Sequence, residues 1–526
     1  MKKVMAVMGI GMALIAVGGS GCKRGGEAVK PPAPDPMAIM FGQVDEFMRA
    51  GQTNEAVSLL DTSLKKAEFT AQRGPILRSL IYIMLLSGRL DDAKARFLEA
   101  APQGEEAIGQ SFGMVRDYLS RNGTPQEQLA WSEKLTKLPL STRLSSTAWA
   151  WYLDDLRKTG GMARVLSLLP TCLSRFSTDE TRQVVSWVLD RAVAEADYDS
   201  AESLVNALET NEAYRTKLAA MLAMGRSQIL IGQGKWDGIE QLFRSRVPRL
   251  TDAESADFLA RLVGAAMGKG QFDLVDRLCA HVLKDVKKGD GLVRQAADSW
   301  VQSANQRKDV EELMSRMEAL RELKVPAPVI VALCNRHFYD VMNTGKAETK
   351  TRVVAFAQTL CEGLDPKTNA EDIKQLEGLI TDGAVVTDNY KLALELVKKN
   401  RQGKDKDWQE MAINKLEAHL ALKEGRSDEA VVKFRKFMEY IAKTDSAMVD
   451  PVSGLRYSKE MTLGLNAKRI GDILKSAGKQ SDANQSYGEA RKYYETALKD
   501  TPAGSPEETL IKDRLKEINA PAASQR

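Results

Sequence analysis

Turn-forming residues recur about every 36 residues along almost the whole of this 526-residue chain. They fall at Gly51, Gly88, Gly123, Gly160, Ala196, Gly234, Gly270, Asn305, Gly345, Thr387, Gly425 and Gly478. A period of this size is typical of proteins that stack small structural units, because one unit cannot bury its hydrophobic face alone. The pattern therefore favours a stacked repeat over a single folded enzyme core.

Two apolar positions follow each turn residue, five and nine residues further along the chain. The fifth position is apolar in ten of twelve units, with Gln128 and Lys350 as exceptions, and the ninth in eleven, with Ser132 as the exception. The hydrophobic fraction of 43% would give about five at either position. Residues four apart lie on one face of a helix, so these positions predict the buried stripe of a second helix in each unit.

The best-matching units are Gly88–Phe97 (GRLDDAKARF), Gly425–Phe434 (GRSDEAVVKF) and the unit around Gly478. Their small residue five positions after the turn and large residue nine positions after it resemble the tetratricopeptide repeat family. The resemblance covers about residues 37–500. It implies an all-α fold, a right-handed α–α superhelix (solenoid) of about twelve helical hairpins, with a concave surface that binds a protein or peptide partner.

Interruptions of the repeat suggest how the chain is divided. Glu322–Pro328 (ELKVPAP) contains prolines that cannot continue a helix, and Gly363–Ala370 is a second break. Ser505 and Glu508 form a capping box at the start of a last helix. We therefore expect an N-terminal array over 37–325, a C-terminal array over 326–500 with an irregular loop at 441–459, and a capping helix with a loose tail over 501–526.

The first 21 residues have the features of a secretory signal peptide. Lys2 and Lys3 precede an apolar stretch, Val4–Val17, and small residues lead up to Cys22. The stretch has 14 residues, whereas a membrane-spanning helix needs about 20. Small residues directly before a cysteine resemble the lipobox of bacterial lipoproteins, although Gly19 stands where that family usually has leucine. The resemblance implies a lipidated Cys22, carrying palmitate or a similar chain; simple cleavage near Gly21 is the alternative.

We expect residues 22–36 to comprise the lipidated cysteine and, after it, a tether, because the stretch is rich in glycine and proline. A leader of this kind implies export and attachment to the cell envelope. Lys23 after the cysteine, rather than aspartate, resembles the sorting signal for the outer membrane. We therefore expect a periplasmic or surface-facing protein anchored to the membrane through Cys22.

Four other cysteines, Cys172, Cys279, Cys334 and Cys361, have irregular spacings and form no CxxC pair. A disulfide is possible in an oxidising compartment. Cys279 occupies a repeat position that is otherwise apolar, which favours buried, unpaired thiols.

Residues suited to catalysis are few. The three histidines lie outside known motifs, and Cys334 with His337 supplies only two ligands for a metal. Gly109–Gly113 (GQSFG) fits the pattern of a hydrolase nucleophile elbow around Ser111, but no strand precedes it, so we interpret it as a chance match. We predict no enzymatic activity, no cofactor and no metal.

Three polar or aromatic clusters remain. Asp91–Asp92 and Asp154–Asp155 are interpreted as solvated helix faces. Trp149, Trp151 and Tyr152 are the densest aromatic group. Core packing is the favoured interpretation of this group, and a platform on which a ligand stacks is the alternative.

The net charge of +4, with acids and bases interspersed, argues against nucleic acid as a partner. The leading hypothesis is a non-enzymatic, lipid-anchored scaffold that binds a protein or peptide. The alternative is a glycan-binding outer-membrane lipoprotein similar to the starch-binding SusD-like family, although aromatic residues make up only 6% of the chain. The loop at 441–459 could contact the partner or serve as a spacer.

Overall fold

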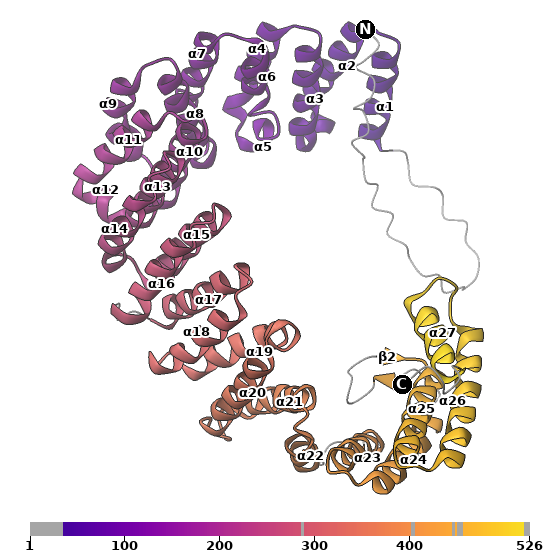
Figure 1. Ribbon diagram of the computed structural model, residues 1–526. Helices are drawn as coiled ribbons and strands as arrows, with labels where there is room; N and C mark the ends of the chain where they lie inside the picture. Colours follow the sequence, from indigo (N-terminus) through magenta and orange to yellow (C-terminus); the bar gives the residue numbers. More distant parts are fainter. Residues whose placement is uncertain (1–34, 286–288, 401–405, 444–447, 450–455, 520–526) are drawn as a thin grey trace. The chain divides into compact units, whose positions relative to one another are not determined.

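The computed structural model describes residues 35–285, 289–400, 406–443, 448–449 and 456–519 (Figure 1). In these residues the chain forms 27 α-helices, and its only strands are the two-residue β1 (Met448–Val449) and β2 (Arg456–Tyr457), which pair antiparallel. The all-α prediction is confirmed. The predicted signal peptide, Cys22 and nearly all of the tether lie outside the described residues, as does most of the loop at 441–459.

The chain divides into two compact units, residues up to Val188 and residues from Leu189 onward, with the boundary inside α10 (Thr178–Ala194). Before α10, the helices of the first unit pair into four hairpins: α1 (Pro36–Arg49) with α2 (Thr53–Leu64), α3 (Arg73–Leu86) with α4 (Leu90–Ala100), α6 (Met114–Asn122) with α7 (Pro125–Thr136), and α8 (Thr142–Lys158) with α9 (Met162–Leu173). Short segments lie between them: η1 (Ala67–Gln72), η2 (Ala101–Gln103) and α5 (Glu105–Ile108).

After α10, which is followed by α11 (Tyr198–Thr210), the second unit continues with seven more hairpins. They are α13 (Ala219–Gly232) with α14 (Asp237–Arg246), α15 (Asp252–Gly268) with α16 (Phe272–Asp285), α17 (Asp290–Gln306) with α18 (Val310–Glu322), α19 (Ala327–Thr344) with α20 (Ala347–Glu362), α21 (Ala370–Val386) with α22 (Tyr390–Lys399), α23 (Lys406–Lys423) with α24 (Ser427–Ala442), and α25 (Lys459–Ser476) with α26 (Gln480–Asp500). The additional segments are α12 (Glu212–Lys217), η3 (Val247–Arg249) and α27 (Pro506–Asn519). These are eleven hairpins, and α10 with α11, joined by the turn at Ala196, supplies a twelfth, so the described residues hold about the predicted number. In each hairpin we call the helix that comes earlier in the chain the first helix and the one that follows it the second helix.

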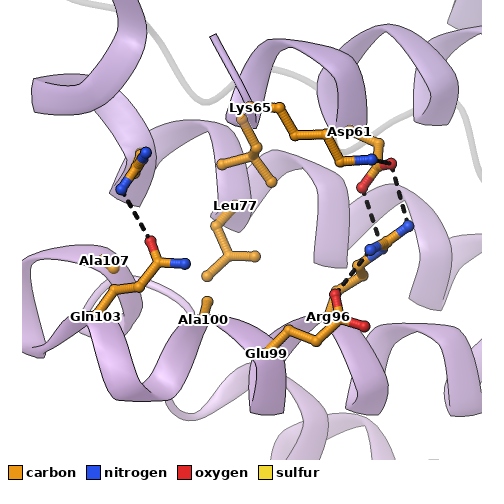
Figure 2. Close-up of a pocket in the computed structure, with 10 residues that line it drawn as sticks. Asp61, Lys65, Leu77, Arg96, Glu99, Ala100, Gln103 and Ala107 are labelled. Atoms are coloured by element: carbon orange, nitrogen blue, oxygen red, sulfur yellow. Dashed lines mark hydrogen bonds and ion pairs between the residues drawn. The ribbon is translucent and has the colours of Figure 1, made fainter. Parts of the chain in front are cut away.

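Ion pairs join the second helices of neighbouring hairpins. In the first unit, Asp61 on α2 accepts from Arg96 on α4, with 3.1 Å between Asp61 Oδ1 and Arg96 Nε (Figure 2). In the second unit, Arg277 Nε on α16 lies 2.7 Å from Glu240 Oε2 on α14. Partners are therefore one repeat apart in sequence, so the ion pairs depend on the hairpins stacking in register.

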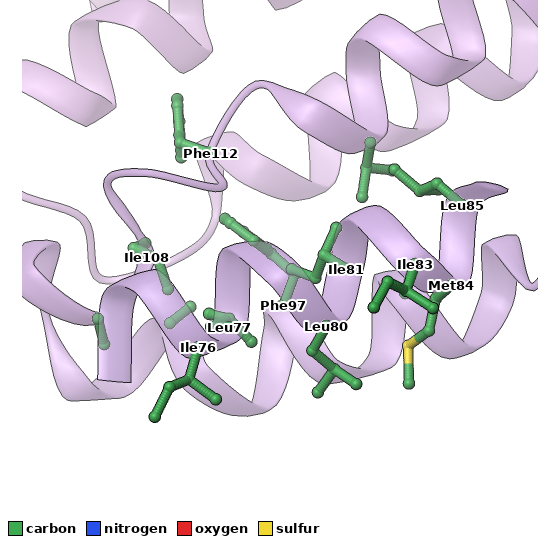
Figure 3. Close-up of a cluster of buried hydrophobic side chains, with 14 of the residues drawn as sticks. Ile76, Leu77, Leu80, Ile81, Ile83, Met84, Leu85, Phe97, Ile108 and Phe112 are labelled. Carbon is green, nitrogen blue, oxygen red and sulfur yellow. The ribbon is translucent and has the colours of Figure 1, made fainter. Parts of the chain in front are cut away.

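The predicted stripe of the second helices is confirmed as the centre of the core. Ala56, Leu60, Ala93 and Phe97, at the fifth and ninth positions of the first two units, have no exposed surface. Figure 3 shows Phe97 among apolar side chains that include Leu77, Leu80 and Ile81 of α3. A small residue at the fifth position lets the two helices of a hairpin approach closely, and the large residue at the ninth fills the space beside it.

Most predicted turn residues occupy the left-handed region, where glycine is favoured. Gly51, Gly88, Gly160, Gly234, Gly270, Gly425 and Gly478 all have φ between 70° and 79°, and Ala196 has φ 56°. Two predicted turn residues were wrong: the left-handed residue is Lys308 instead of Asn305, and Asp388 instead of Thr387. Lysine and aspartate do not by themselves indicate a left-handed conformation, so the sequence placed these two turns too early. Gly123 and Gly345 end their helices with negative φ.

We expect Lys308→Gly to stabilise the protein by about 0.5–1 kcal/mol, since a lysine held at positive φ is strained and a glycine is not. Lys308 is exposed, so little packing is lost. Lys346→Gly is the matched control, because Lys346 is exposed in the next hairpin turn but has φ −68°. Thermal unfolding measures both; equal effects of the two substitutions would contradict the prediction.

The predicted interruptions correspond to connections between helices. The break at Glu322–Pro328 covers the end of α18 and the start of α19, and the core continues across it through Leu320, Val325 and Val329. The division of the array at residue 325 stays a prediction. The last helix, α27, begins after Ser505 as expected, with Ser505 Oγ accepting from the Glu508 N–H. The capping box is incomplete, because the Glu508 carboxylate accepts from the Gly504 N–H.

An insertion of about a dozen residues, 101–113, separates the second and third hairpins and includes η2 and α5. It packs tightly on α3: a Cβ on Gly74 would lie 2.6 Å from the Glu106 carbonyl oxygen. Glu105 contacts the first turn of α8, where its carboxylate accepts from Arg143 Nε at 2.8 Å. Insertions of this kind in repeat proteins often carry contacts to a partner.

Candidate partner-binding surface

Large apolar side chains are exposed mainly on first helices. Among the described residues nine such side chains are exposed, and eight lie on first helices: Ile39, Tyr82, Leu86, Trp187, Tyr339, Val386, Trp408 and Leu422. Only Val432 lies on a second helix, α24. Exposed apolar residues that gather on one kind of surface often mark an interaction site. This asymmetry makes the first helices the candidate binding surface.

Four of these eight exposed residues share two positions in the first helices. Tyr82 and Tyr339 lie six residues before the left-handed or turn residue of their hairpins, and Leu86 and Val386 lie two residues before it. These positions are four apart and therefore share one helix face. We call this face, in either unit, the first-helix stripe.

The position six residues before the turn is also strongly acidic. Its twelve occupants are Asp45, Tyr82, Asp117, Asp154, Asp190, Gln228, Gly264, Gln302, Tyr339, Asp382, His419 and Asp472. Six of twelve are aspartate and none is aliphatic, in a helix whose other face is apolar. This periodic signal is visible in the sequence alone once the turn residues are aligned.

Side chains at this position meet across neighbouring first helices. Gln228 Nε2 on α13 donates to Asp190 Oδ1 on α10 at 3.2 Å, and Tyr339 OH on α19 donates to Asp382 Oδ2 on α21 at 2.6 Å. Partial burial and then the Asp382 carboxylate raise the pKa of Tyr339 to about 12, so the phenol stays a donor at neutral pH. In the second unit the stripe therefore contains polar contacts between neighbouring first helices, with Tyr339 and Val386 exposed on the same face.

The prediction that Asp154 and Asp155 form a solvated face was wrong. Asp154 is 0% exposed and Asp155 2%, because residues 148–157 of α8 are buried on every side. Asp155 Oδ1 accepts from Arg116 Nη2 at 2.8 Å and from Gln128 Nε2 at 2.9 Å, and Arg157 Nη2 lies 2.8 Å from Asp154 Oδ1. The sequence did not reveal these ion pairs, because Arg116 comes from another helix and Arg157 lies one turn further along the same helix. Asp91 and Asp92 are exposed, as expected.

The aromatic group Trp149, Trp151 and Tyr152 belongs to the core, as the favoured interpretation held. Phe112 of the insertion stacks on Trp151, with 5.1 Å between ring centroids, and the Arg116 guanidinium lies 5.0 Å from that ring. All three side chains are less than a tenth exposed. This group therefore offers no platform on which a sugar could stack.

Ser111 is fully buried, and its hydroxyl donates to the Ile108 carbonyl oxygen at 3.1 Å. The short helix α5 precedes it, whereas a nucleophile elbow requires a strand. Cys334 and His337 are buried together in α19, and no group of three potential metal ligands occurs in the described residues. Within the same residues, none of the helices combines the length and the apolar character needed to cross a membrane.

The four cysteines of the described chain are all free thiols. Cys172, Cys279 and Cys334 are buried and Cys361 is half-buried. Burial raises the pKa of Cys172 and of Cys334 to about 12, and burial likewise raises the pKa of Cys361. Burial raises the pKa of Cys279 as well, so at all four positions it disfavours the thiolate, which is the reactive form.

We expect iodoacetamide at pH 8 to modify Cys361 on the order of tenfold faster than the other three thiols, since access limits the reaction once the thiolate is scarce. The experiment uses the full chain with Cys22→Ala, so that the predicted anchor does not react. Mass spectrometry of timed samples gives the four rates. Similar rates at Cys279 and Cys361 would contradict the burial described above.

Comparison with known proteins adds little to this picture. No protein-family model and no curated protein matches the chain. The solved structures to which it is similar include Naa15/Naa10 bound to HypK-THB, at 10% identity and a TM-score of 0.24, covering 91% of this chain and 78% of that chain. Another is the APC/C hetero-tetramer Cut9–Hcn1, at 9% identity and a TM-score of 0.20, covering 92% and 97%. At these scores the similarity carries no argument, and the description of this chain as a series of helical hairpins rests on its own structure.

Proposed function

We propose that this protein is a non-enzymatic scaffold of the bacterial cell envelope that binds a segment of a partner protein along its first-helix stripe. The observation that carries the proposal is the exposure of Tyr82, Leu86, Tyr339 and Val386 on one face of first helices, at a position that is aspartate in six of the twelve hairpins and at the position four residues after it. Tyrosine is enriched at protein interfaces because it offers a large apolar ring and a hydroxyl together. Within a unit, stacked hairpins present the same helix face again and again, which suits an extended ligand.

The second part of the proposal is the anchor: a lipid on Cys22 holds the array at the envelope membrane. Its support is the sequence alone, namely the short apolar stretch followed by small residues and a cysteine. One acyl chain gives only marginal attachment, so a diacylated cysteine is what stable anchoring requires.

Photo-crosslinking in the native host tests the binding surface. A benzoylphenylalanine is placed at Tyr82 or Tyr339 on the stripe, and at Val432 as the matched control, which is equally exposed but lies on a second helix. We expect discrete protein adducts from the two stripe positions and none from the control. Adducts from Val432 alone, or none from either stripe position, would remove the proposal.

Metabolic labelling with a radioactive fatty acid tests the anchor. Incorporation into the wild type and its loss in Cys22→Ala is the expected result. Equal labelling of the two proteins, or none in the wild type, would leave the scaffold without its predicted attachment while the crosslinking result still stood.

A further inference from the structure

A small cavity of about 140 Å³ is lined by residues of α2, α3, α4 and the insertion 101–113, and none of them lies at a stripe position of α3. Figure 2 shows Asp61, Arg96, Glu99, Leu77 and Gln103 around it. The remaining walls come from Leu64, Lys65, Arg73, Ala100 and Ala107. Gln103 and Ala107 belong to the insertion 101–113, so the cavity exists only because the regular repeat is interrupted here.

The charges that line this cavity do not all have partners. Asp61 lies 3.1 Å from Lys65 Nζ and 3.1 Å from Arg96 Nε, and Glu99 Oε2 lies 2.7 Å from Arg96 Nη1. The two carboxylates are therefore matched by Lys65 and Arg96. Arg73 is the remaining cation, and no carboxylate of the described residues pairs with it.

The hydrogen-bonding capacity of the Arg73 guanidinium is only partly used, which leaves it able to bind an anion. Its Nη1 donates to the neutral amide oxygen of Gln103 at 3.2 Å, and its Nε is buried without an acceptor. Arg73 is also the first residue of α3, where the partial positive charge of the helix end adds to that of the guanidinium. An arginine in this setting favours a carboxylate, because the planar fork can donate two parallel hydrogen bonds to it.

The size of the cavity selects the kind of ligand. A volume of about 140 Å³ holds roughly four or five waters. This suits one carboxylate side chain, whereas a whole small molecule needs about 300–1,000 Å³. A second hollow of about 490 Å³ shares Asp61, Arg96 and Glu99 with the first and has Val57 and Met84 in its lining. If a bound peptide placed one side chain in the small cavity, its backbone could continue over this larger hollow.

We propose that Arg73 receives the carboxylate of a glutamate or aspartate in an acidic segment of the partner protein, seated between α2 and α4. The inference rests on the proposed function, since it takes the ligand to be a protein. It adds a second contact surface to the first-helix stripe and assigns the charge of the segment that binds there.

Fluorescence anisotropy with labelled peptides tests this. The probes are a ten-residue peptide alternating glutamate and alanine and its glutamine counterpart, titrated with the full-length protein at low salt. We expect the acidic peptide to bind at least about tenfold more tightly, the preference to be lost in Arg73→Gln, and Glu99→Gln, which removes a competing carboxylate, to raise the affinity several-fold. Arg78→Gln is the matched control, because Arg78 is an exposed arginine of the same helix outside the cavity.

Three results would overturn the inference: no binding of the acidic peptide up to 1 mM, equal loss in Arg78→Gln and Arg73→Gln, or a decrease in affinity in Glu99→Gln. Hydrogen exchange of α3 in each variant shows whether a loss reflects unfolding. If crosslinks at Tyr82 persist while the acidic peptide fails to bind, this inference falls and the scaffold function stands. Absence of all crosslinks removes the function itself.

Discussion

Replacing Asp155 by leucine is expected to cost the first unit about 3–5 kcal/mol of stability, because the change leaves a buried arginine without its partner. Arg116 and Asp155 are both almost completely buried, and Arg116 Nη2 donates to Asp155 at 2.8 Å. The remaining carboxylate near Arg116 is that of Asp154, at 4.0 Å, and it is already paired with Arg157. Hydrogen exchange of peptides from α8 measures the free energy of local opening, which is better defined here than one global value for a repeat array.

Two further variants separate the buried charge from other effects of the substitution. Asp155→Leu combined with Arg116→Met removes both charges, and should be less destabilising than Asp155→Leu alone, since no unpaired ion stays buried. Asp91→Leu is the exposed control, with a side chain that is 98% exposed, and should change stability by less than about 0.5 kcal/mol. A cost below about 1 kcal/mol for Asp155→Leu would contradict the buried network.

Phe97→Ala is expected to cost about 3–5 kcal/mol, the usual range when a fully buried aromatic ring is removed from a core. Phe97 occupies the ninth position of its unit and has no exposed surface. Its ring lies 6.0 Å from that of Phe112 in the insertion and 5.8 Å from that of Trp131 in the next hairpin. The single ring therefore holds the second hairpin, the insertion and the third hairpin together.

Tyr82→Ala is the matched control for this prediction. Tyr82 is an aromatic residue of the same hairpin, but it is 48% exposed on the first-helix stripe. We expect it to leave stability within about 0.5 kcal/mol of the wild type while reducing partner binding. Thermal unfolding compares the two proteins. Similar destabilisation by both substitutions would mean that the exposed stripe also serves the core, and would weaken the case for it as a binding surface.

Much of the fold followed from local rules. The apolar positions five and nine residues after each turn predicted helices that the structure contains, since four-residue spacing places side chains on one face in any helix. Glycine marked seven of the left-handed turns because few other residues adopt that conformation easily. At Lys308 and Asp388 the same conformation is imposed by the surrounding hairpin, so composition could not reveal it.

Much less of the candidate surfaces could be predicted. The aspartates six residues before the turns were visible as a periodic signal, and the exposed tyrosines could have been found at the same position. The cavity around Arg73 could not, because its walls come from α2, α3, α4 and an insertion that follows no repeat. The burial of Asp154 and Asp155 could not be predicted either, because neighbouring helices cover α8 and the local sequence pattern does not specify them.

By itself the sequence determined that this chain forms stacked helical hairpins, because the repeat of small and large apolar residues is a local property of each unit. The proposed anchor at Cys22 is likewise read from a linear motif and stays a prediction. Only the tertiary structure decided which charges are buried, which aromatic residues stay exposed and where a cation lacks a partner. Those properties depend on which side chains meet across helices about one repeat apart, and packing in three dimensions sets them.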